Sequence, residues 1–255
     1  MITETEVPWK EIDEKSMHTA TTFLFYGGAG SGKTYLLGQF PNPLILACDP
    51  GPTGGARSAL LSWERLPEGE RGTRPKIAKI FSYDQLNSLL PKLEAFAGKS
   101  EGFTTLAVDS LSYLQRIIMQ DVMRKSGRET PQFADWGLSQ ERLRNLISKF
   151  ADFKCFTVLT ATEQIQKDEI IGKLIGSPNL PGKLAIELPQ ACDVVCRLFV
   201  VSSLTPQGKV VKYKFSSTPD DIWVARDRTG TLPIEGDTNI NSFKHLLKLE
   251  TETEV

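Results

Sequence analysis

The chain contains 255 residues, of which 40% are hydrophobic, 9% aromatic and 24% charged, and its net charge is −1. This length and composition fit one soluble α/β domain with an ordinary core. No apolar run approaches the roughly 18 residues that span a bilayer, and the first 20 residues are polar, which argues against a membrane segment or a secretory signal. We therefore expect a cytoplasmic protein with no membrane partner.

The cysteines, the histidines and the charge distribution exclude further kinds of site. Three of the four cysteines lie in or beside apolar runs, where a thiol behaves as a small hydrophobe, so no disulfide framework is expected. The two histidines, His18 and His245, are far apart in the sequence, which disfavours a histidine-centred site. Without the acidic ends 1–15 and 250–255, the chain carries 28 basic and 23 acidic residues, a balance that permits a nucleic-acid partner.

Taken in chain order, short apolar runs alternate with longer amphipathic stretches. The expected strands are Phe23–Tyr26, Leu44–Cys48, Lys76–Phe81, Thr105–Val108, Thr157–Ala161, Val194–Val201 and Lys209–Phe215. The expected helices are Lys33–Phe40, Tyr83–Ala97, Ser110–Lys125 and Ser139–Phe153. Glycine and proline punctuation predicts loops over 50–75, 126–138 and 165–190.

This alternation predicts an α/β fold with a mostly parallel central sheet that is flanked by helices on both faces. No linker divides the chain. We expect a polar N-terminal extension over 1–19, one core over 20–238, and a C-terminal helix with an acidic tail over 239–255.

The segment after the first expected strand matches the pattern G-x-x-x-x-G-K-[ST] in full, and an expected helix follows it. In this pattern the backbone N–H groups and the helix N-terminus hold phosphates, Lys33 reaches the β- and γ-phosphates, and the Thr34 hydroxyl ligates Mg²⁺. The expected cofactors are therefore ATP and Mg²⁺. The predicted nucleotide-binding residues are Gly27, Gly28, Ala29, Gly30, Ser31, Gly32, Lys33, Thr34 and Tyr35.

A second part of the site is the apolar run Leu106–Val108, which ends in the carboxylate Asp109. An aspartate in this place holds Mg²⁺ opposite the phosphate-loop threonine, directly or through water. Apolar strands that end in aspartate are common, but the signal is strong downstream of a phosphate loop. Thr34 and Asp109 are the predicted metal-binding residues.

Other features narrow the class of P-loop protein. The residue after Asp109 is Ser110, whereas AAA+ ATPases usually place a catalytic glutamate there, which argues against that class. No N-K-x-D guanine motif of the small GTPases is present. Four arginines over 57–79 keep a small-molecule kinase with an arginine-rich lid open as an alternative.

Over roughly residues 20–230 the order of features resembles the RecA-like recombinase core. Residues 108–111 (Val-Asp-Ser-Leu) look like that family's Walker B segment, and 162–165 (Thr-Glu-Gln-Ile) are similar to its strand ending in Asn-Gln-Ile. The resemblance implies that Gln164 senses the γ-phosphate and informs the DNA-binding loop that follows. The short chain more narrowly resembles phage-encoded nucleotide-binding proteins of the core-only recombinase and single-strand annealing type, which would act in the bacterial host cytoplasm.

The sequence departs from this family where the water-activating base is expected. RecA-like proteins carry a catalytic glutamate just past the second strand, and the matching position here is Asp49. Its shorter side chain leaves two candidates open, Asp49 and Glu163. Asp49 also reads equally well as a turn residue before Pro50.

Residues 226–230 (Arg-Asp-Arg-Thr-Gly) are similar to a Lys-Asn-Arg-x-Gly segment of RecA-fold proteins, in which basic residues reach a neighbouring subunit's nucleotide. The resemblance implies that Arg226 or Arg228 acts in trans, with a homo-oligomer (ring or filament) as the active form. The alternative is a solvated hairpin with two arginines.

The segments 126–138 and 165–190 fall where the first and second DNA-binding loops of the resembled family lie. The residues predicted to contact nucleic acid are Arg128, Trp136, Lys167, Lys173 and Lys183. The predicted function is ATP hydrolysis coupled to single-stranded DNA in recombination, annealing or replication, with single-strand-binding or replication proteins as further partners. A nucleotide-dependent helicase loader is the main alternative, and a small-molecule kinase is the second.

Overall fold

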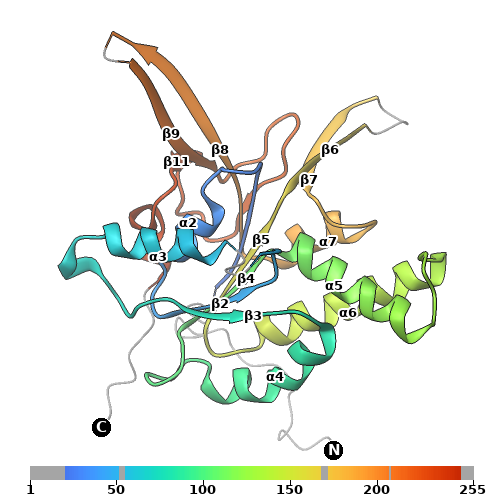
Figure 1. The fold of residues 1–255 in the computed structure, drawn as a ribbon. Coiled ribbons are helices and arrows are strands. Elements are labelled where there is room, and N and C mark those ends of the chain that lie inside the picture. Colours follow the sequence, from blue (N-terminus) through green and yellow to red (C-terminus); the bar gives the residue numbers. More distant parts are fainter. Residues whose placement is uncertain (1–20, 52–54, 168–171, 207, 248–255) are drawn as a thin grey trace, which may run out of the picture.

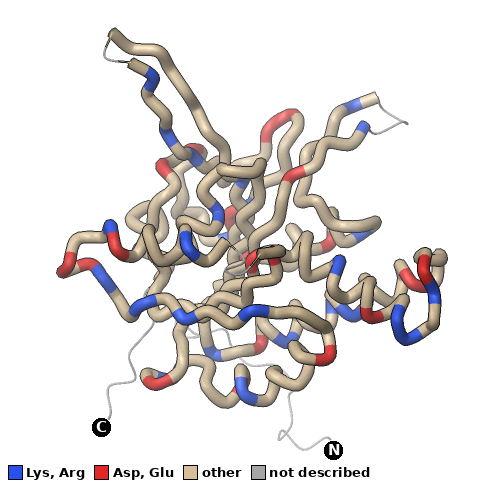
Figure 2. The backbone as a smooth tube through the Cα atoms, viewed as in Figure 1, with Lys and Arg blue, Asp and Glu red and all other residues tan. Residues whose placement is uncertain are grey.

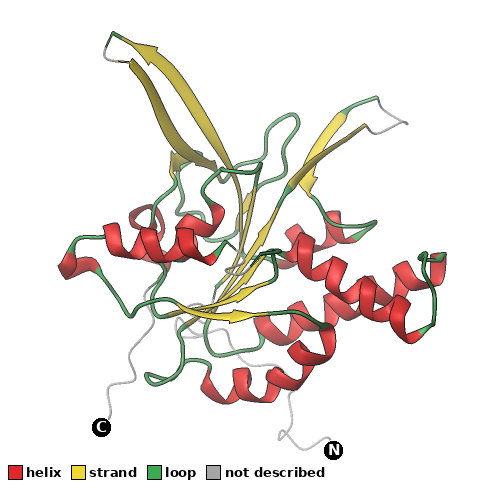
Figure 3. Ribbon diagram, in the orientation of Figure 1, coloured by secondary structure: helices red, strands yellow, loops and turns green. Residues whose placement is uncertain are grey.

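The computed structural model of the protein describes residues 21–51, 55–167, 172–206 and 208–247. Figure 1 shows the ribbon coloured along the chain, and Figure 3 colours it by secondary structure. The strands are β1 (Thr22–Tyr26), β2 (Pro43–Ala47), β3 (Lys76–Lys79), β4 (Thr105–Asp109), β5 (Phe156–Ala161), β6 (Glu163–Lys167), β7 (Leu174–Pro178), β8 (Val194–Thr205), β9 (Gly208–Ser216), β10 (Arg226–Asp227) and β11 (Glu235–Asp237). The α-helices are α2 (Lys33–Leu37), α3 (Ala56–Arg65), α4 (Tyr83–Phe96), α5 (Leu111–Lys125), α6 (Phe133–Ala151) and α7 (Leu184–Ala191), and 3₁₀ turns lie at Glu68–Glu70 and Ile240–Leu246.

In the described part of the chain, nine strands form one sheet in the order β11-β9-β8-β1-β5-β4-β2-β3, with β10 beside β8. The strands from β8 to β3 in this order are parallel, which confirms the predicted mostly parallel sheet. Because parallel strands share the edge at which their carboxyl ends lie, the segments that follow β1, β2, β4 and β5 meet there. This edge carries the candidate site.

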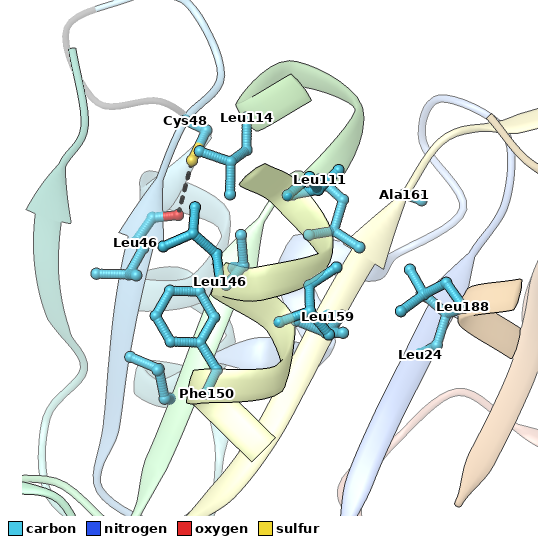
Figure 4. Close-up of a cluster of buried hydrophobic side chains, with 14 of the residues drawn as sticks. Leu24, Leu46, Cys48, Leu111, Leu114, Leu146, Phe150, Leu159, Ala161 and Leu188 are labelled. Carbon is cyan, nitrogen blue, oxygen red and sulfur yellow. Dashed lines mark hydrogen bonds between the residues drawn. The ribbon is translucent and has the colours of Figure 1, made fainter. Parts of the chain in front are cut away.

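Helices cover both faces of the sheet, as predicted. Helices α4, α5, α6 and α7 pack on one face, where Leu46 and Leu159 of the strands gather with Leu146 and Phe150 of α6 (Figure 4). On the other face, α2, α3 and the C-terminal 3₁₀ segment cover Phe23, Phe25 and their neighbours. Each fully buried leucine or phenylalanine stabilises the fold by about 1.5–3 kcal/mol relative to an exposed one.

The three segments predicted as loops contain regular structure, and those predictions are wrong in part. Segment 50–75 holds α3, whose buried Ala59 and Ser62 are too few to give a clear sequence periodicity. Helix α6 begins at Phe133 rather than Ser139, because Gln132 and Asp135 form a capping box around its first turn. Segment 165–190 holds most of the β6–β7 hairpin and all but the last residue of α7.

Two hairpins rise from the sheet on the side where the phosphate loop lies (Figure 1). One is β8–β9, whose outer half leaves the sheet as an exposed ribbon. The other is the two-stranded β6–β7 hairpin, which we call the β6–β7 arm (residues 163–178). Basic residues occupy the described ends of this arm (Figure 2).

The C-terminal segment packs into the core as well. Its expected helix is a 3₁₀ segment, and Phe243 in it is fully buried against Phe23, Phe25 and Phe215. The predicted extension over 1–19 and the acidic tail from residue 248 lie outside the described residues.

The cysteines lie inside the fold. All four cysteines are buried as free thiols, and burial raises the pKa of Cys155 and Cys192 to about 12. Among the described residues, no helix combines the length and apolar character that crossing a bilayer requires.

Candidate functional site

The phosphate loop runs from the end of β1 into α2, and close packing imposes its glycines. A Cβ at Gly27 would lie 2.1 Å from the carbonyl oxygen of Leu198 on β8. Gly30 and Gly32 have φ angles of +78° and +93°, a region that side chains other than hydrogen rarely tolerate. The G-x-x-x-x-G-K-T pattern therefore adopts the backbone turn that a phosphate-holding loop requires.

Lys33 is held inside this loop by carbonyl groups. Its Nζ donates to the carbonyl oxygens of Gly27 at 2.8 Å and Gly28 at 2.9 Å. None of the ion pairs found among the described residues involves Lys33. Burial lowers the pKa of Lys33, and nearby carboxylates oppose this effect, namely Asp109, Glu163 and Asp49. Lys33 Nζ also donates to Ser31 Oγ at 3.4 Å, so all of its hydrogen-bond partners among the described residues are uncharged. A partly desolvated ammonium with only uncharged partners gains from an added anion, which fits a phosphate group.

Asp109 ends β4 beside the loop, and both of its carboxylate oxygens are hydrogen-bonded. Thr34 Oγ1 donates to Oδ2 and Thr160 Oγ1 donates to Oδ1, each at 2.7 Å. Burial raises the pKa of Asp109, and the two hydroxyl hydrogen bonds oppose this rise. The sequence did not single out Thr160, which reaches Asp109 because β5 lies between β1 and β4.

The Thr34–Asp109 pair offers the hard oxygen ligands that Mg²⁺ prefers. No group of three or more His, Cys, Asp or Glu able to hold a metal occurs among the described residues. A magnesium ion at this pair would therefore be held by two side chains together with phosphate oxygens and water, the usual arrangement for this ion at nucleotide sites. Thr34 and Asp109 are therefore suitable ligands for a magnesium ion.

Asp49, the first candidate base, is anchored at the end of β2. Its Oδ1 accepts hydrogen bonds from the backbone N and the Oγ of Ser110, each at 3.0 Å, and Lys79 donates to its carbonyl. One carboxylate oxygen thus ties the end of β2 to the segment after β4. Asp49 also lines the cavity beside the phosphate loop, so both readings of this residue have a place in the structure.

Glu163, the second candidate base, lies directly against the phosphate loop. A Cβ at Gly28 would be 3.1 Å from Glu163 Oε1, a tight contact, so the glycine gives the carboxylate room to approach the loop. Its other oxygen accepts a hydrogen bond from Arg197 Nε at 3.0 Å. The sequence did not single out Arg197, because a lone arginine inside a strand gives no local signal.

Gln164 follows Glu163 at the base of the β6–β7 arm and contacts the opposite strand. Its Nε2 donates to Ser177 Oγ at 3.4 Å and to the Pro178 carbonyl at 3.2 Å. Gln164 therefore lies within the arm, one residue after Glu163, and its amide bonds to the opposite strand.

Arg226 and Arg228 lie away from the phosphate loop of their own chain. Both donate to the carbonyl of Gln190, at 3.0 and 2.7 Å, near the end of α7. Arg226 is in β10, which pairs with the first residues of β8 at the opposite end of the sheet from the loop, and Arg228 directly follows β10. The structure does not bring these arginines to the site within one chain.

The predicted nucleic-acid residues fall on separate parts of the molecule. Lys167 and Lys173 are exposed near the described ends of the β6–β7 arm, and exposed Lys183 precedes α7. Arg128 is paired with Asp135 at 2.7 Å, and Trp136 is 40% exposed on α6. Arg128 lies in the α5–α6 connection and Trp136 in the first turn of α6, and this end of the two helices projects in a different direction from the arm (Figure 1).

A cavity of about 660 Å³ lies along the phosphate loop, and Lys33, Thr34, Asp49 and Asp109 line it. Several of its lining residues were not among the predicted ATP- and Mg²⁺-binding residues. They are Ser58 and Arg65 of α3, Tyr113 of α5, Thr162, Tyr213 of β9 and Thr238. Arg65 is the member of the predicted arginine-rich lid that lines the cavity, whereas Arg71 is held by the Leu66 and Glu64 carbonyls.

Comparison with known proteins gives one family. A family model described as an AAA domain matches residues 19–229. Among solved structures, an ATPase from the type III secretion system of pathogenic bacteria is similar, with a TM-score of 0.44 and 17% sequence identity. That alignment covers 71% of this chain and 52% of the ATPase, so the chain spans about half its length. No curated protein matches the chain.

The family match corrects one sequence argument. Ser110 in place of a glutamate argues against the AAA+ class, but the family model that matches most of the chain describes an AAA domain. One position after the acidic strand is thus a poor guide to class, since the acid at the site can come from another strand end. The chain belongs to this family of AAA domains and is a P-loop ATPase domain.

Proposed function

We propose that the protein is a RecA-like ATPase that binds ATP with Mg²⁺ and acts on single-stranded DNA in recombination, annealing or replication, in the manner of phage-encoded core-only recombinases. One observation carries the proposal. Glu163 lies against Gly28 of the phosphate loop and is also the first residue of the exposed β6–β7 arm, which carries Lys167 and Lys173. Nucleotide chemistry and a polyanion-binding surface are therefore adjacent along the chain.

In the nucleotide half of the proposal, each residue has one task. Lys33 binds the β- and γ-phosphates, and Thr34 and Asp109 hold the metal. Bound Mg²⁺ neutralises charge that develops on the phosphoryl oxygens. Asp49 or Glu163 accepts a proton from the attacking water or orients it, and both are near enough to Lys33 to affect its pKa.

In the DNA half, the β6–β7 arm supplies contacts that do not depend on base sequence. Lys167 and Lys173 bind backbone phosphates, while the partly exposed Ile165, Leu174 and Ile175 offer apolar contacts to bases. Gln164, bonded to Ser177 and the Pro178 carbonyl, connects the arm to the site. Lys183, Arg128 and Trp136 extend this surface in the proposal.

The proposed active form is a homo-oligomer in the cytoplasm. Because Arg226 and Arg228 lie at the far end of the sheet from their own phosphate loop, a catalytic role for either one requires a neighbouring subunit. An arginine supplied in trans stabilises charge in the transition state of phosphoryl transfer.

One assay tests this function: hydrolysis of ATP by the full chain with and without single-stranded DNA, across a salt series. We expect DNA to stimulate hydrolysis and the stimulation to fade as salt rises, because phosphate contacts release counterions. Stimulation that ignores salt, or none at all, would refute the DNA half of the proposal.

The same assay separates the alternatives. Hydrolysis with no DNA response favours a helicase loader or another partner-binding module. Transfer of the γ-phosphate to a small acceptor favours a kinase, for which Arg65 in the cavity would be the first residue to examine.

A further inference from the structure

A stacked ion pair links the phosphate loop to the base of the β6–β7 arm. Arg197 on β8 donates from Nε to Glu163 Oε2 at 3.0 Å, and the two side chains are only 21% and 25% exposed. The guanidinium carbon lies 3.5 Å from the centroid of the Trp223 ring and 5.4 Å from that of Phe199. A planar guanidinium stacked in this way has little freedom to rotate, so it fixes the carboxylate that it binds.

The two ends of this stack contact two different functional elements. At one end, Glu163 Oε1 lies 3.1 Å from the Cβ position of Gly28 in the phosphate loop. At the other end, a Cβ at Gly176 of β7 would lie 2.2 Å from the Trp223 ring, so the ring rests on the bare backbone of the arm. A continuous set of contacts therefore runs from the phosphate loop to the arm, through Gly28, Glu163, Arg197, Trp223 and Gly176.

Hydrogen bonds connect the Trp223 segment both to the arm and to β1. Gly176 N donates to the Ile222 carbonyl at 2.7 Å, and Val224 N donates to the Gly176 carbonyl at 3.1 Å. The Tyr26 hydroxyl, on the last residue of β1 before the phosphate loop, donates to the Val224 carbonyl. A displacement of Trp223 would therefore also move the arm and β1, the strand that leads into the phosphate loop.

We propose that Arg197 is a positioning residue for Glu163, and that the Arg197–Trp223 stack conveys the charge of the bound nucleotide to Gly176 in the β6–β7 arm. This inference rests on the proposed ATPase function. A γ-phosphate beside Gly28 gives Arg197 a second anion in addition to the Glu163 carboxylate, whereas ADP lacks that charge. The guanidinium then shifts across the face of Trp223, and the ring shifts on Gly176.

Tryptophan fluorescence tests this directly. The chain has four tryptophans, so the triple variant Trp9→Phe, Trp63→Phe and Trp136→Phe leaves Trp223 as the single reporter. We expect its emission to differ between a hydrolysis-resistant ATP analogue and ADP, each with Mg²⁺ and each at saturation verified by equilibrium dialysis. Arg197→Lys in this background keeps the charge and removes the planar stack, so the difference should fall by more than half.

Kinetics give a second reading of Arg197→Lys in the otherwise unchanged chain. Because a positioning residue acts in the chemical step, we expect kcat to fall roughly tenfold while KM for ATP stays within about twofold. The matched control is Arg144→Lys. This substitution alters an exposed ion pair of 2.6 Å with Glu187, away from the phosphate loop, and should change neither kcat nor the Trp223 emission difference. Thermal unfolding verifies that both variants are folded.

The outcomes separate this inference from the proposed function. Equal emission with the ATP analogue and ADP, in a chain that binds and hydrolyses ATP, would overturn this inference alone. An undiminished difference in Arg197→Lys would overturn it as well. A chain that binds neither nucleotide would overturn the proposed function and this inference together.

Discussion

The phosphate loop and the β6–β7 arm are neighbours in space but are built in opposite ways. In the loop and beside it, the polar groups are buried or half-buried and are held by partners from different elements, as Asp109 is by Thr34 of α2 and Thr160 of β5. In the arm, β6 and β7 form a two-stranded sheet of their own that is bonded to the Trp223 segment at Gly176, and Lys167 and Lys173 are exposed.

The difference follows from what each region would bind. A triphosphate has a fixed geometry, so its site gains from groups that are already in place before binding. A flexible polyanion offers repeating charge, for which exposed lysines on a pliable ribbon are sufficient. The Glu163–Arg197 contact lies where the two kinds of region meet.

The largest expected effect comes from Lys33→Ala in the buried region. We expect ATP turnover to fall by roughly 10³-fold or more, because the only ammonium inside the loop is lost from the transition state. Steady-state hydrolysis with thermal unfolding as a check of folding measures this. Turnover at the unaltered rate would break the assignment of the loop.

Arg228→Ala tests whether the nucleotide site is completed by a neighbouring subunit. If Arg228 acts in trans, turnover falls by as much as about 10³-fold. Stability should change by no more than about 0.5 kcal/mol, because Arg226 still binds the Gln190 carbonyl and the Asp193 pair is exposed.

Mixing this variant with Lys33→Ala gives the control. Mixed oligomers contain interfaces that pair an intact loop with an intact arginine, so part of the activity should return. Full activity of Arg228→Ala alone would remove the arginine from catalysis.

The exposed region is tested by the double variant Lys167→Gln and Lys173→Gln. We expect affinity for single-stranded DNA to fall roughly tenfold at low salt, and the slope of log affinity against log salt to become shallower by about 1.4. Fluorescence anisotropy of a labelled oligonucleotide measures both. As a matched control, Lys149→Gln and Lys154→Gln remove two exposed charges elsewhere, and an equal loss in that variant would show that only net charge matters.

The smallest expected effect is on stability. Burial raises the pKa of Asp109, so folding favours the protonated carboxyl group. This preference stabilises the fold fully at pH values below the usual aspartate pKa. The stabilisation is lost as pH rises through the pKa of Asp109 in the folded state. Asp109→Asn should therefore raise the melting temperature of the nucleotide-free chain by a few degrees at pH 7. The gain should shrink as pH falls toward 4, and a gain that is independent of pH would show that the charge is not its cause.

Much of this molecule could be predicted from the sequence. Seven of the nine strands in the described sheet were placed to within a few residues, since each is an apolar run bounded by turn residues, whereas the short β10 and β11 were missed. The phosphate loop and Asp109 were found because their spacing reflects local backbone chemistry. Helix α3 and the first turn of α6 were missed, because a few buried small residues and a capping box around Asp135 leave a weak periodic signal.

The sequence by itself determined the groups that would grip a phosphate, because glycine, lysine and threonine at fixed spacing act through one short stretch of backbone. Only the tertiary structure decided which distant side chains join them. Thr160 reaches Asp109 because β5 lies between β1 and β4, and Arg197 reaches Glu163 because β8 lies beside β1. These contacts depend on strand order, which nonlocal packing of the apolar faces sets and which no local pattern encodes.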